Sequence, residues 1–351
     1  MTPSHTTPEA WAKLRSLYGL QEIEKWWVEH QPFLLSRGYA LRPCYHPIWT
    51  PTWELPGNED EPCYRFEDSI PIGVPGNVLD AVRIVDNVKV VLKLVRTTQE
   101  MDLAWYLGEY LPTTEPDPWN RCAPLLEKLD FEALNIKHEQ YKGLLVFPFL
   151  RQFDDPPFRQ LREVTEAVGQ FLQAAEYMHA KNVAHRDFCS GNLMMDASRV
   201  VSCGWHFEAP WTRCGKGEGI KSVPRSTKTY LLDVGKYGQD KTVPELSGTV
   251  PYNPFKVDIY QLGNVIMELI ETYEGLEIFR ELAEVMTRKN PAERPTASEC
   301  VELFHDLVST ISEDAPHLLA GIFGFRRRGG RLGGFMLLAA PPEFFTYFGS
   351  Y

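Results

Sequence analysis

One short segment, AHRDFCSGNLMMD at residues 184–196, contains the side chains with the most evident chemistry. It includes His185, Arg186 and Asp187, and Asn192 follows at the fifth position after the aspartate. Phosphoryl transfer needs a carboxylate that orients the acceptor hydroxyl and takes its proton, and an amide oxygen that holds a metal ion against the phosphates. This spacing therefore indicates a phosphoryl-transfer loop. The alternative is a surface loop with a chance HRD tripeptide.

The segments on either side of this loop are expected to be regular elements. Apolar residues recur at helical spacing before it, which predicts a long helix with one buried face. The NLMMD stretch after it predicts a strand. A loop held between two such elements can position its side chains, which argues against a chance tripeptide. The helical apolar positions are Leu161, Val164, Val168, Phe171, Leu172, Ala175 and Met178.

Strand patterns dominate the first half of the chain. The stretches VLDAVRIV and VKVVLKLV, separated by Asp86-Asn87, predict a hairpin with Lys93 inside its second strand. Such a lysine is either a solvated edge residue or a buried ammonium with an anionic partner. Strands before residue 150 and helices after it predict an α+β fold with two lobes. The later helices are expected at 258–271, 274–287 and 297–312.

These segments, in this order, resemble the eukaryotic protein kinase superfamily. The resemblance implies a two-lobed protein kinase-like fold, with a small β-rich N-lobe and a larger helical C-lobe. It also implies that Lys93 contacts the α- and β-phosphates of ATP. Glu100 in TTQEMDLAWYL fits the glutamate that pairs with this lysine in the family, and Glu109 is the alternative.

The segment PIGVPGNV resembles the family's glycine-rich loop, G-x-G-x-x-G-x-V. Gly73 and Gly76 match the second and third glycines, whereas Pro71 replaces the first. Glycines are needed there because backbone amides must approach the phosphates closely. The resemblance implies that Val78 and Ala81, which match the family's V-x-x-A, help to form the nucleotide site.

The strand LLVFPFL resembles the hinge that holds the adenine ring in the family. By register, Phe147 would line the back of the nucleotide pocket. Pro148 would offer its carbonyl oxygen, and Leu150 would offer its backbone N–H. Proline suits the first of these positions because no donor is required there. A core strand that ends in a turn is the alternative.

Further matches follow the catalytic segment. Asp233 begins D-V-G, which resembles the family's D-F-G and implies an Mg²⁺ ligand together with Asn192. Glu245, Asp258 and Arg294 match structural residues of the lobe that binds protein substrates. They argue against a further interpretation of the D-x4-N loop, namely that it belongs to a small-molecule phosphotransferase.

A closer likeness is to a group of fungal kinase-like proteins. It extends back to about residue 20 and includes a helical leader with paired tryptophans. The shared sequence motifs include FEDS, L-D-A-x-R-I, M-H-x-x-N-V-A-H-R-D and P-F-K-V-D-I-Y. This likeness implies kinase architecture and says much less about the substrate.

Cys189 and Val234, together with Pro71, depart from the family pattern and favour an alternative, a pseudokinase that serves as a binding scaffold. Cys189 stands where serine/threonine kinases usually have a lysine that steadies the γ-phosphate. Val234 is smaller than the usual phenylalanine, so the packing around it is expected to be looser. The stretch from Asp233 to Glu245 is short, which leaves little room for a loop controlled by phosphorylation.

Charge and cysteine usage limit the partners and the compartment. The net charge of −11 argues against nucleic acid or anionic lipid as the main partner. No apolar run reaches the roughly 18 residues of a membrane span. The seven cysteines are scattered and follow no export signal, which predicts reduced thiols inside the cell, in the cytosol or the nucleus. Cys203, His206 and Cys214 lack a fourth ligand at useful spacing, so no zinc site is expected.

The expected organisation has four parts. A helical and irregular extension spans 1–70, the N-lobe 71–149, the C-lobe 150–315 and a poorly ordered tail 316–351. The expected activity is phosphoryl transfer from ATP, with Mg²⁺, to a protein hydroxyl, Ser or Thr rather than Tyr. ATP and a protein substrate or partner are the expected partners.

Overall fold

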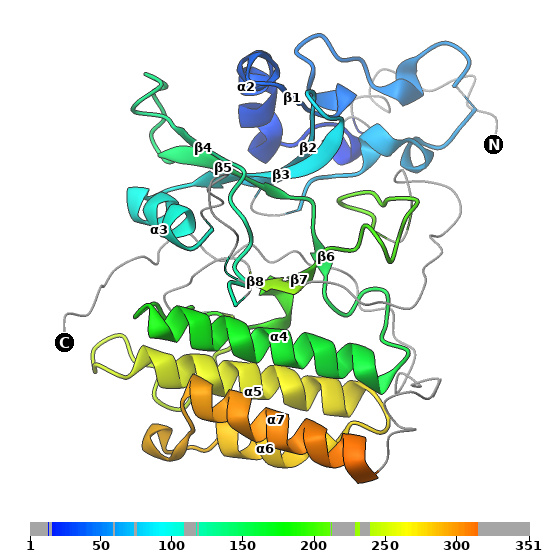
Figure 1. The fold of residues 1–351 in the computed structure, drawn as a ribbon. Helices are drawn as coiled ribbons and strands as arrows, with labels where there is room; N and C mark the ends of the chain where they lie inside the picture. The colour runs from blue at the N-terminus through cyan, green and yellow to red at the C-terminus, as the bar shows by residue number, and fades with distance from the viewer. Residues whose placement is uncertain are drawn as a thin grey trace.

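The computed structural model describes residue 13 and residues 16–58, 60–73, 76–108, 117, 119–210, 212, 229–231 and 239–314. A β-sheet forms the upper part of the molecule and a bundle of helices the lower part, joined near residue 150 (Figure 1). This arrangement confirms the α+β, two-lobed kinase-like fold. Glu109, Cys214, Asp233, Val234 and the tail 316–351 lie outside the described residues.

The N-lobe sheet is antiparallel, with the strand order β1-β2-β3-β5-β4. The hairpin between β2 and β3 turns where Asp86-Asn87 predicts it, and Asn87 adopts a φ of 57°. Asparagine tolerates this left-handed conformation better than most residues. The strands are β1 (Tyr39–Ala40), β2 (Val78–Arg83), β3 (Val88–Val95), β4 (Glu127–Asp130) and β5 (Gly143–Pro148).

Helix α3 (Thr98–Gly108) follows β3 almost at once and packs against β3 and β5. Met101 of this helix lies in a small hydrophobic cluster with Val95, Leu125 and Leu145. Because only two residues separate β3 from α3, the first turn of the helix stays next to the end of the strand.

The N-terminal extension covers the other face of the sheet. Helix α2 (Lys25–Ser36) contributes Trp26, Trp27 and Leu34 to a hydrophobic cluster with the outer side chains of β2, β3 and β5. Strand β1 also comes from the extension and pairs with β2. The extension is therefore part of the N-lobe. Its short 3₁₀ turns are η1 (Glu22–Glu24), η2 (Pro43–Tyr45), η3 (Thr52–Glu54), η4 (Cys63–Arg65) and η5 (Glu67–Ser69).

In the described residues, the C-lobe has four α-helices around one hydrophobic core. A small sheet of β6, β7 and β8 lies between these helices and the N-lobe (Figure 1). Helix α4 carries the predicted apolar face, and Phe171 and Leu172 are buried in the core. The elements are β6 (Arg151–Gln152), α4 (Leu161–Ala180), η6 (Ser190–Asn192), β7 (Leu193–Met195), β8 (Thr229–Leu231), α5 (Pro254–Thr272), η7 (Glu277–Phe279), α6 (Arg280–Met286), η8 (Pro291–Glu293) and α7 (Ala297–Asp314).

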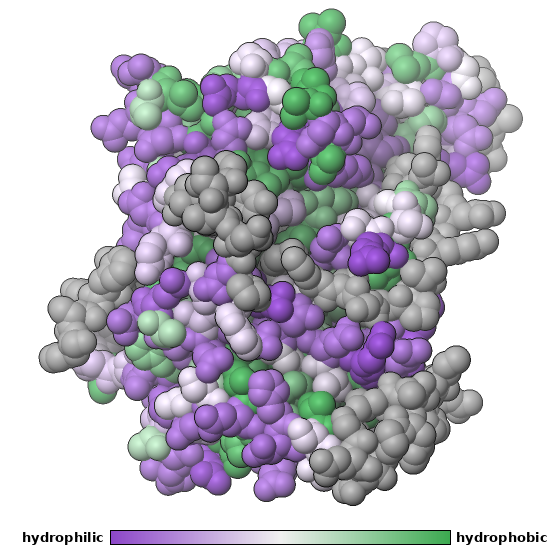
Figure 2. Space-filling model, in the orientation of Figure 1, coloured by the Kyte–Doolittle hydropathy of each residue, from purple (hydrophilic) through white to green (hydrophobic). Residues whose placement is uncertain are grey.

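The surface is mixed in character. The face drawn in Figure 2 is mainly hydrophilic, with scattered hydrophobic residues. Among the helices of the described residues, none is both long and apolar enough to cross a membrane.

Candidate functional site

Lys93 and Glu100 form an ion pair beneath the N-lobe sheet, with 2.8 Å between Nζ and Oε1. Lys93 lies in β3 and Glu100 in the first turn of α3, so the short connection between these elements brings them together. Thr97 Oγ1 accepts the backbone N–H of Glu100 at 3.1 Å, which helps to begin the helix. Both side chains are largely buried, so the pair is shielded from solvent.

The strand register shows which predicted residues share a face with Lys93. Val78 and Leu145 are its direct neighbours on β2 and β5, and Phe147 lies two residues beyond Leu145 on the same face. Ala81 lies three residues from Val78 and therefore points to the opposite face. It is buried there in the cluster beneath α2. The structure therefore separates Ala81 from Lys93, and the expectation that it contributes to the nucleotide site is corrected.

In the predicted glycine-rich segment, Gly76 is hydrogen-bonded to Gly73 and to the extension. The N–H of Gly76 donates to the carbonyl of Gly73 at 2.8 Å, and Gly76 has a φ of +79°, a conformation that favours glycine. The indole Nε1 of Trp27 donates to the Gly76 carbonyl at 2.7 Å. A Cβ at Gly76 would lie only 3.0 Å from Ile23 Cβ. The extension therefore holds Gly76 in place.

In the predicted hinge, Phe147 and Pro148 end β5, and Leu150 directly precedes β6, so this segment connects the lobes. Next to it, the ring of Phe149 stacks on Trp205 with 4.8 Å between the ring centroids. Lys89 Nζ donates to the Trp205 carbonyl at 2.9 Å. The C-lobe residue Trp205 thus contacts both the hinge and the N-lobe, a role that the sequence analysis misses.

The catalytic segment places Asp187 in a buried, hydrogen-bonded position. Its side chain is 2% exposed, and its Oδ1 accepts the backbone N–H of Gln239 at 2.6 Å. Asn192 Nδ2 donates to the carbonyl of Asp187 at 2.9 Å. This bond orients the amide and leaves Asn192 Oδ1 as the atom that could bind a metal ion.

The backbone of the catalytic segment is held by helix α5. Asp258 is fully buried, and its carboxylate accepts the N–H of His185 at 2.8 Å and of Arg186 at 2.5 Å. His179 Nε2 contacts the same carboxylate at 2.8 Å. Gln261, one turn along α5, accepts the N–H of Phe188 at 3.1 Å. The sequence motif indicates Asp258 but not Gln261, although the i, i+3 spacing places both on one helix face.

Glu245 and Arg294 form a bidentate ion pair, with oxygen–nitrogen distances of 2.5 and 2.8 Å. Arg294 is 2% exposed, and its guanidinium lies 4.6 Å from the ring centroid of Tyr260. The pair joins two distant chain segments, as the resemblance implies.

The side chains beside Asp187 differ from the kinase pattern. Burial and the neighbouring Asp187 raise the pKa of Cys189 to about 12, so this position carries a neutral thiol. Ser190 Oγ donates to Glu268 at 2.5 Å. Burial, and then the carboxylate of Asp240, raise the pKa of Glu268.

The metal site stays a prediction. Asn192 has a suitable oxygen, but Asp233, the second predicted ligand, lies outside the described residues. Within the described part of the chain, no group of three or more His, Cys, Asp or Glu side chains is placed to hold a metal ion.

Comparisons with known proteins identify distant protein kinases. The dual specificity protein kinase CLK4 of Mus musculus is 23% identical over 230 residues, which cover 62% of this chain and 46% of that protein. The serine/threonine-protein kinase pak-1 of Caenorhabditis elegans is 23% identical over 266 residues, 73% of this chain and 42% of that protein. The chain spans less than half the length of these relatives.

Two other comparisons, with family models and with solved structures, give weaker support. No family model matches the chain. A solved structure of the Rad53 kinase domain and SCD2 is 12% identical, covers 64% of this chain and 81% of that one, and has a TM-score of 0.41. The relatives therefore support the protein kinase superfamily at long distance, and the fungal likeness stays a prediction.

Proposed function

We propose that this chain is a protein kinase-like phosphotransferase that transfers the γ-phosphoryl group of ATP to a protein hydroxyl. The Lys93–Glu100 ion pair carries this proposal. A buried ammonium held by a carboxylate, on the same sheet face as Val78 and Phe147, suits the phosphates of a nucleotide whose base lies at the hinge.

Each residue has a role in the proposed reaction. Lys93 binds the α- and β-phosphates, while the Pro148 carbonyl and the Leu150 N–H hold the base. Asp187 orients the acceptor hydroxyl and takes its proton. Asn192 and Asp233 would hold Mg²⁺, which supplies positive charge to the transferred group.

The relatives support a choice of acceptor. Those named above are serine/threonine or dual specificity protein kinases, which supports Ser or Thr over Tyr.

Every cysteine that the structure describes is unpaired, which supports a reducing, intracellular compartment.

A pseudokinase scaffold is the second candidate, because of Cys189. Its thiol is neutral at pH 7, so this position offers no cation to the γ-phosphate. A chain that binds ATP without transferring its phosphoryl group would fit this departure.

Thermal unfolding with and without ATP, in Mg²⁺ or in chelator, tests nucleotide binding. ATP at 100 times its dissociation constant should stabilise the wild type by about 2.7 kcal/mol. Lys93→Met should lose this stabilisation, whereas Lys128→Met, at the surface of the same lobe, should keep it. An unchanged melting temperature at millimolar ATP would contradict the proposal.

Turnover separates the two candidates. A kinase should phosphorylate a protein substrate in the wild type and lose this activity in Asp187→Asn, while the ATP-induced stabilisation remains. ATP-dependent stabilisation with no turnover in the wild type, and with turnover in Cys189→Lys, would favour the scaffold.

A further inference from the structure

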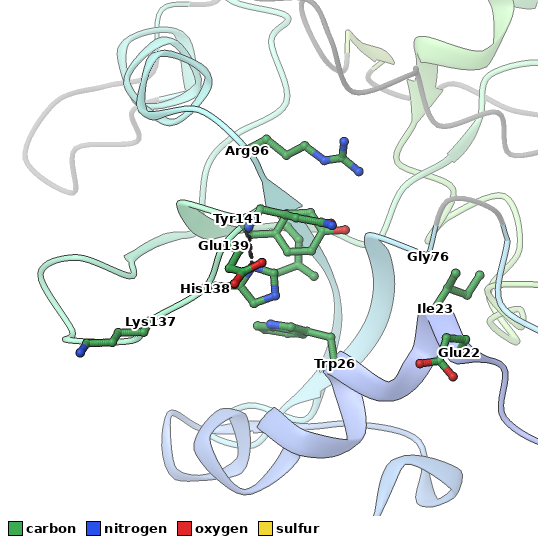
Figure 3. Close-up of a pocket in the computed structure, with 11 residues that line it drawn as sticks. Glu22, Ile23, Trp26, Gly76, Arg96, Lys137, His138, Glu139 and Tyr141 are labelled. Atoms are coloured by element: carbon green, nitrogen blue, oxygen red, sulfur yellow. Dashed lines mark hydrogen bonds between the residues drawn. The ribbon is translucent and has the colours of Figure 1, made fainter.

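A pocket of about 560 Å³ opens on the face of the N-lobe sheet opposite Lys93, and Gly76 of the predicted glycine-rich segment is among the residues that line it. Its walls come from the extension, from the loop between β4 and β5, and from the end of β3 with Arg96 directly after it (Figure 3). Leu94 lines this pocket, and its strand neighbour Lys93 points to the opposite face. The volume is in the usual range for small-molecule sites, roughly 300–1,000 Å³.

One wall of the pocket is aromatic and rigid. His138 stacks on Tyr141 with 4.9 Å between the ring centroids, and Trp26 meets His138 edge-on at 6.3 Å. Trp26 is itself stacked on His30 at 4.1 Å. The N–H groups of Gln140 and Tyr141 donate to His138 Nδ1 and hold its ring. Such a wall offers edges and faces on which another planar ring can pack.

Arg96 provides a positive charge at the upper end of this wall. Its guanidinium lies 5.6 Å from the ring centroid of Tyr141 and has no carboxylate partner among the described residues. It extends over the pocket in Figure 3, whereas Lys137 points away.

The other charged groups of the pocket do not favour a cationic ligand. Glu22 pairs with Lys25 at 2.6 Å. Glu139 lies beside His138 rather than beside Arg96 (Figure 3). Burial, and then the neighbouring His30, lower the pKa of His138, so its ring is neutral at pH 7.

We propose that this pocket binds an aromatic ring that carries a phosphate or carboxylate group. The ring packs against His138 and Trp26, and the anion pairs with Arg96, whose stacked guanidinium can accept a bidentate partner. A free small molecule and a phosphotyrosine side chain of a peptide share this chemistry. Binding itself does not depend on the proposed kinase activity.

Calorimetric titration with phenyl phosphate tests the site. We expect binding to the wild type and an affinity about tenfold lower in Arg96→Ala, as for the loss of a charge-assisted hydrogen bond. Arg83→Ala removes an exposed arginine of the same sheet and should bind as the wild type does. Inorganic phosphate and benzyl alcohol, which each lack half of the ligand, should bind more weakly.

Lys93→Met distinguishes this pocket from the nucleotide site. Phenyl phosphate should bind this variant as it binds the wild type, even if ATP does not bind either protein. Loss of binding in Lys93→Met, equal binding in Arg96→Ala, or no binding to the wild type would each overturn the proposal. A phosphotyrosyl peptide that binds more tightly than phenyl phosphate would identify a peptide as the source, and weaker binding a small molecule.

Discussion

The carboxylate of Asp258 holds the backbone of Arg186 in a conformation that this residue would otherwise avoid. Arg186 has a φ of +66°, and its N–H donates to Asp258 Oδ1 at 2.5 Å. Left-handed backbone costs a non-glycine residue about 1–2 kcal/mol, so the surrounding contacts must offset it. The next residue is Asp187, and the strained turn therefore helps to set the position of the proposed catalytic carboxylate.

Asp258→Asn should lower the free energy of unfolding by about 3 kcal/mol, because an amide cannot accept all the N–H groups that face this buried carboxylate. Denaturant unfolding measures the loss, and faster hydrogen exchange at His185 and Arg186 would localise it. Asp306→Asn, at an exposed position of α7, is the control and should change little. A loss in Asp258→Asn no larger than in this control would contradict the role of Asp258.

The ion pair between Glu245 and Arg294 should be worth more than a surface pair. Arg294→Ala should cost about 3 kcal/mol, since it leaves Glu245 partly buried without its partner. The exposed pair of Arg280 and Glu277 is the matched control, and its coupling energy should stay below about 1 kcal/mol. Double-mutant cycles for both pairs give the comparison, and equal coupling energies would refute it.

Acid should weaken the contact between Glu67 and His206. Burial raises the pKa of Glu67, but the hydrogen bond from His206 and the charge of Arg42 outweigh it, so the net shift is downward. A lowered folded-state pKa stabilises the protein above the ordinary value of 4.5, and this contribution is lost as the pH falls through the folded-state pKa.

The measurement is denaturant unfolding between neutral and acid pH. Stability of the wild type should fall more steeply below pH 4.5 than that of Glu67→Gln. Glu302→Gln, at an exposed position of α7, should follow the wild-type curve. Parallel curves for the wild type and Glu67→Gln would show that Glu67 does not contribute.

Two adjacent tryptophans provide a matched pair of variants. Trp27→Phe removes the hydrogen bond to the buried Gly76 carbonyl, whereas the Nε1 of Trp26 has no hydrogen-bond partner. Trp27→Phe should therefore cost about 1 kcal/mol more than Trp26→Phe in denaturant unfolding. It should also weaken ATP-dependent stabilisation if Gly76 contributes to the nucleotide site. A larger loss in Trp26→Phe would contradict this assignment.

Several residues of the candidate site could be predicted because their evidence is local. Glu100 follows Lys93 closely, so a short connection from strand to helix is enough to pair them. Asp187 and Asn192 lie within one segment between a helix and a strand. The order of these segments along the chain was sufficient to predict the two lobes.

The error at Ala81 has a simple physical cause. Ala81 was assigned to the nucleotide site because it fits the family's V-x-x-A pattern. Residues three apart in a strand, however, point to opposite faces. The hairpin at Asp86-Asn87 opposes Val78 to Lys93. The alternation of side chains between the two faces of the strand was therefore the signal that could have corrected the assignment.

The sequence alone determined the α+β architecture, the presence of the β2–β3 hairpin and the residues of the HRD segment, since each depends on local periodicity or on order along the chain. Tertiary structure decided that Trp27 holds Gly76, that Trp205 contacts the hinge and that Gln261 supports the catalytic segment. These contacts join residues far apart in the chain. They depend on how the extension, the segment around Trp205 and α5 pack, and no local pattern encodes such packing.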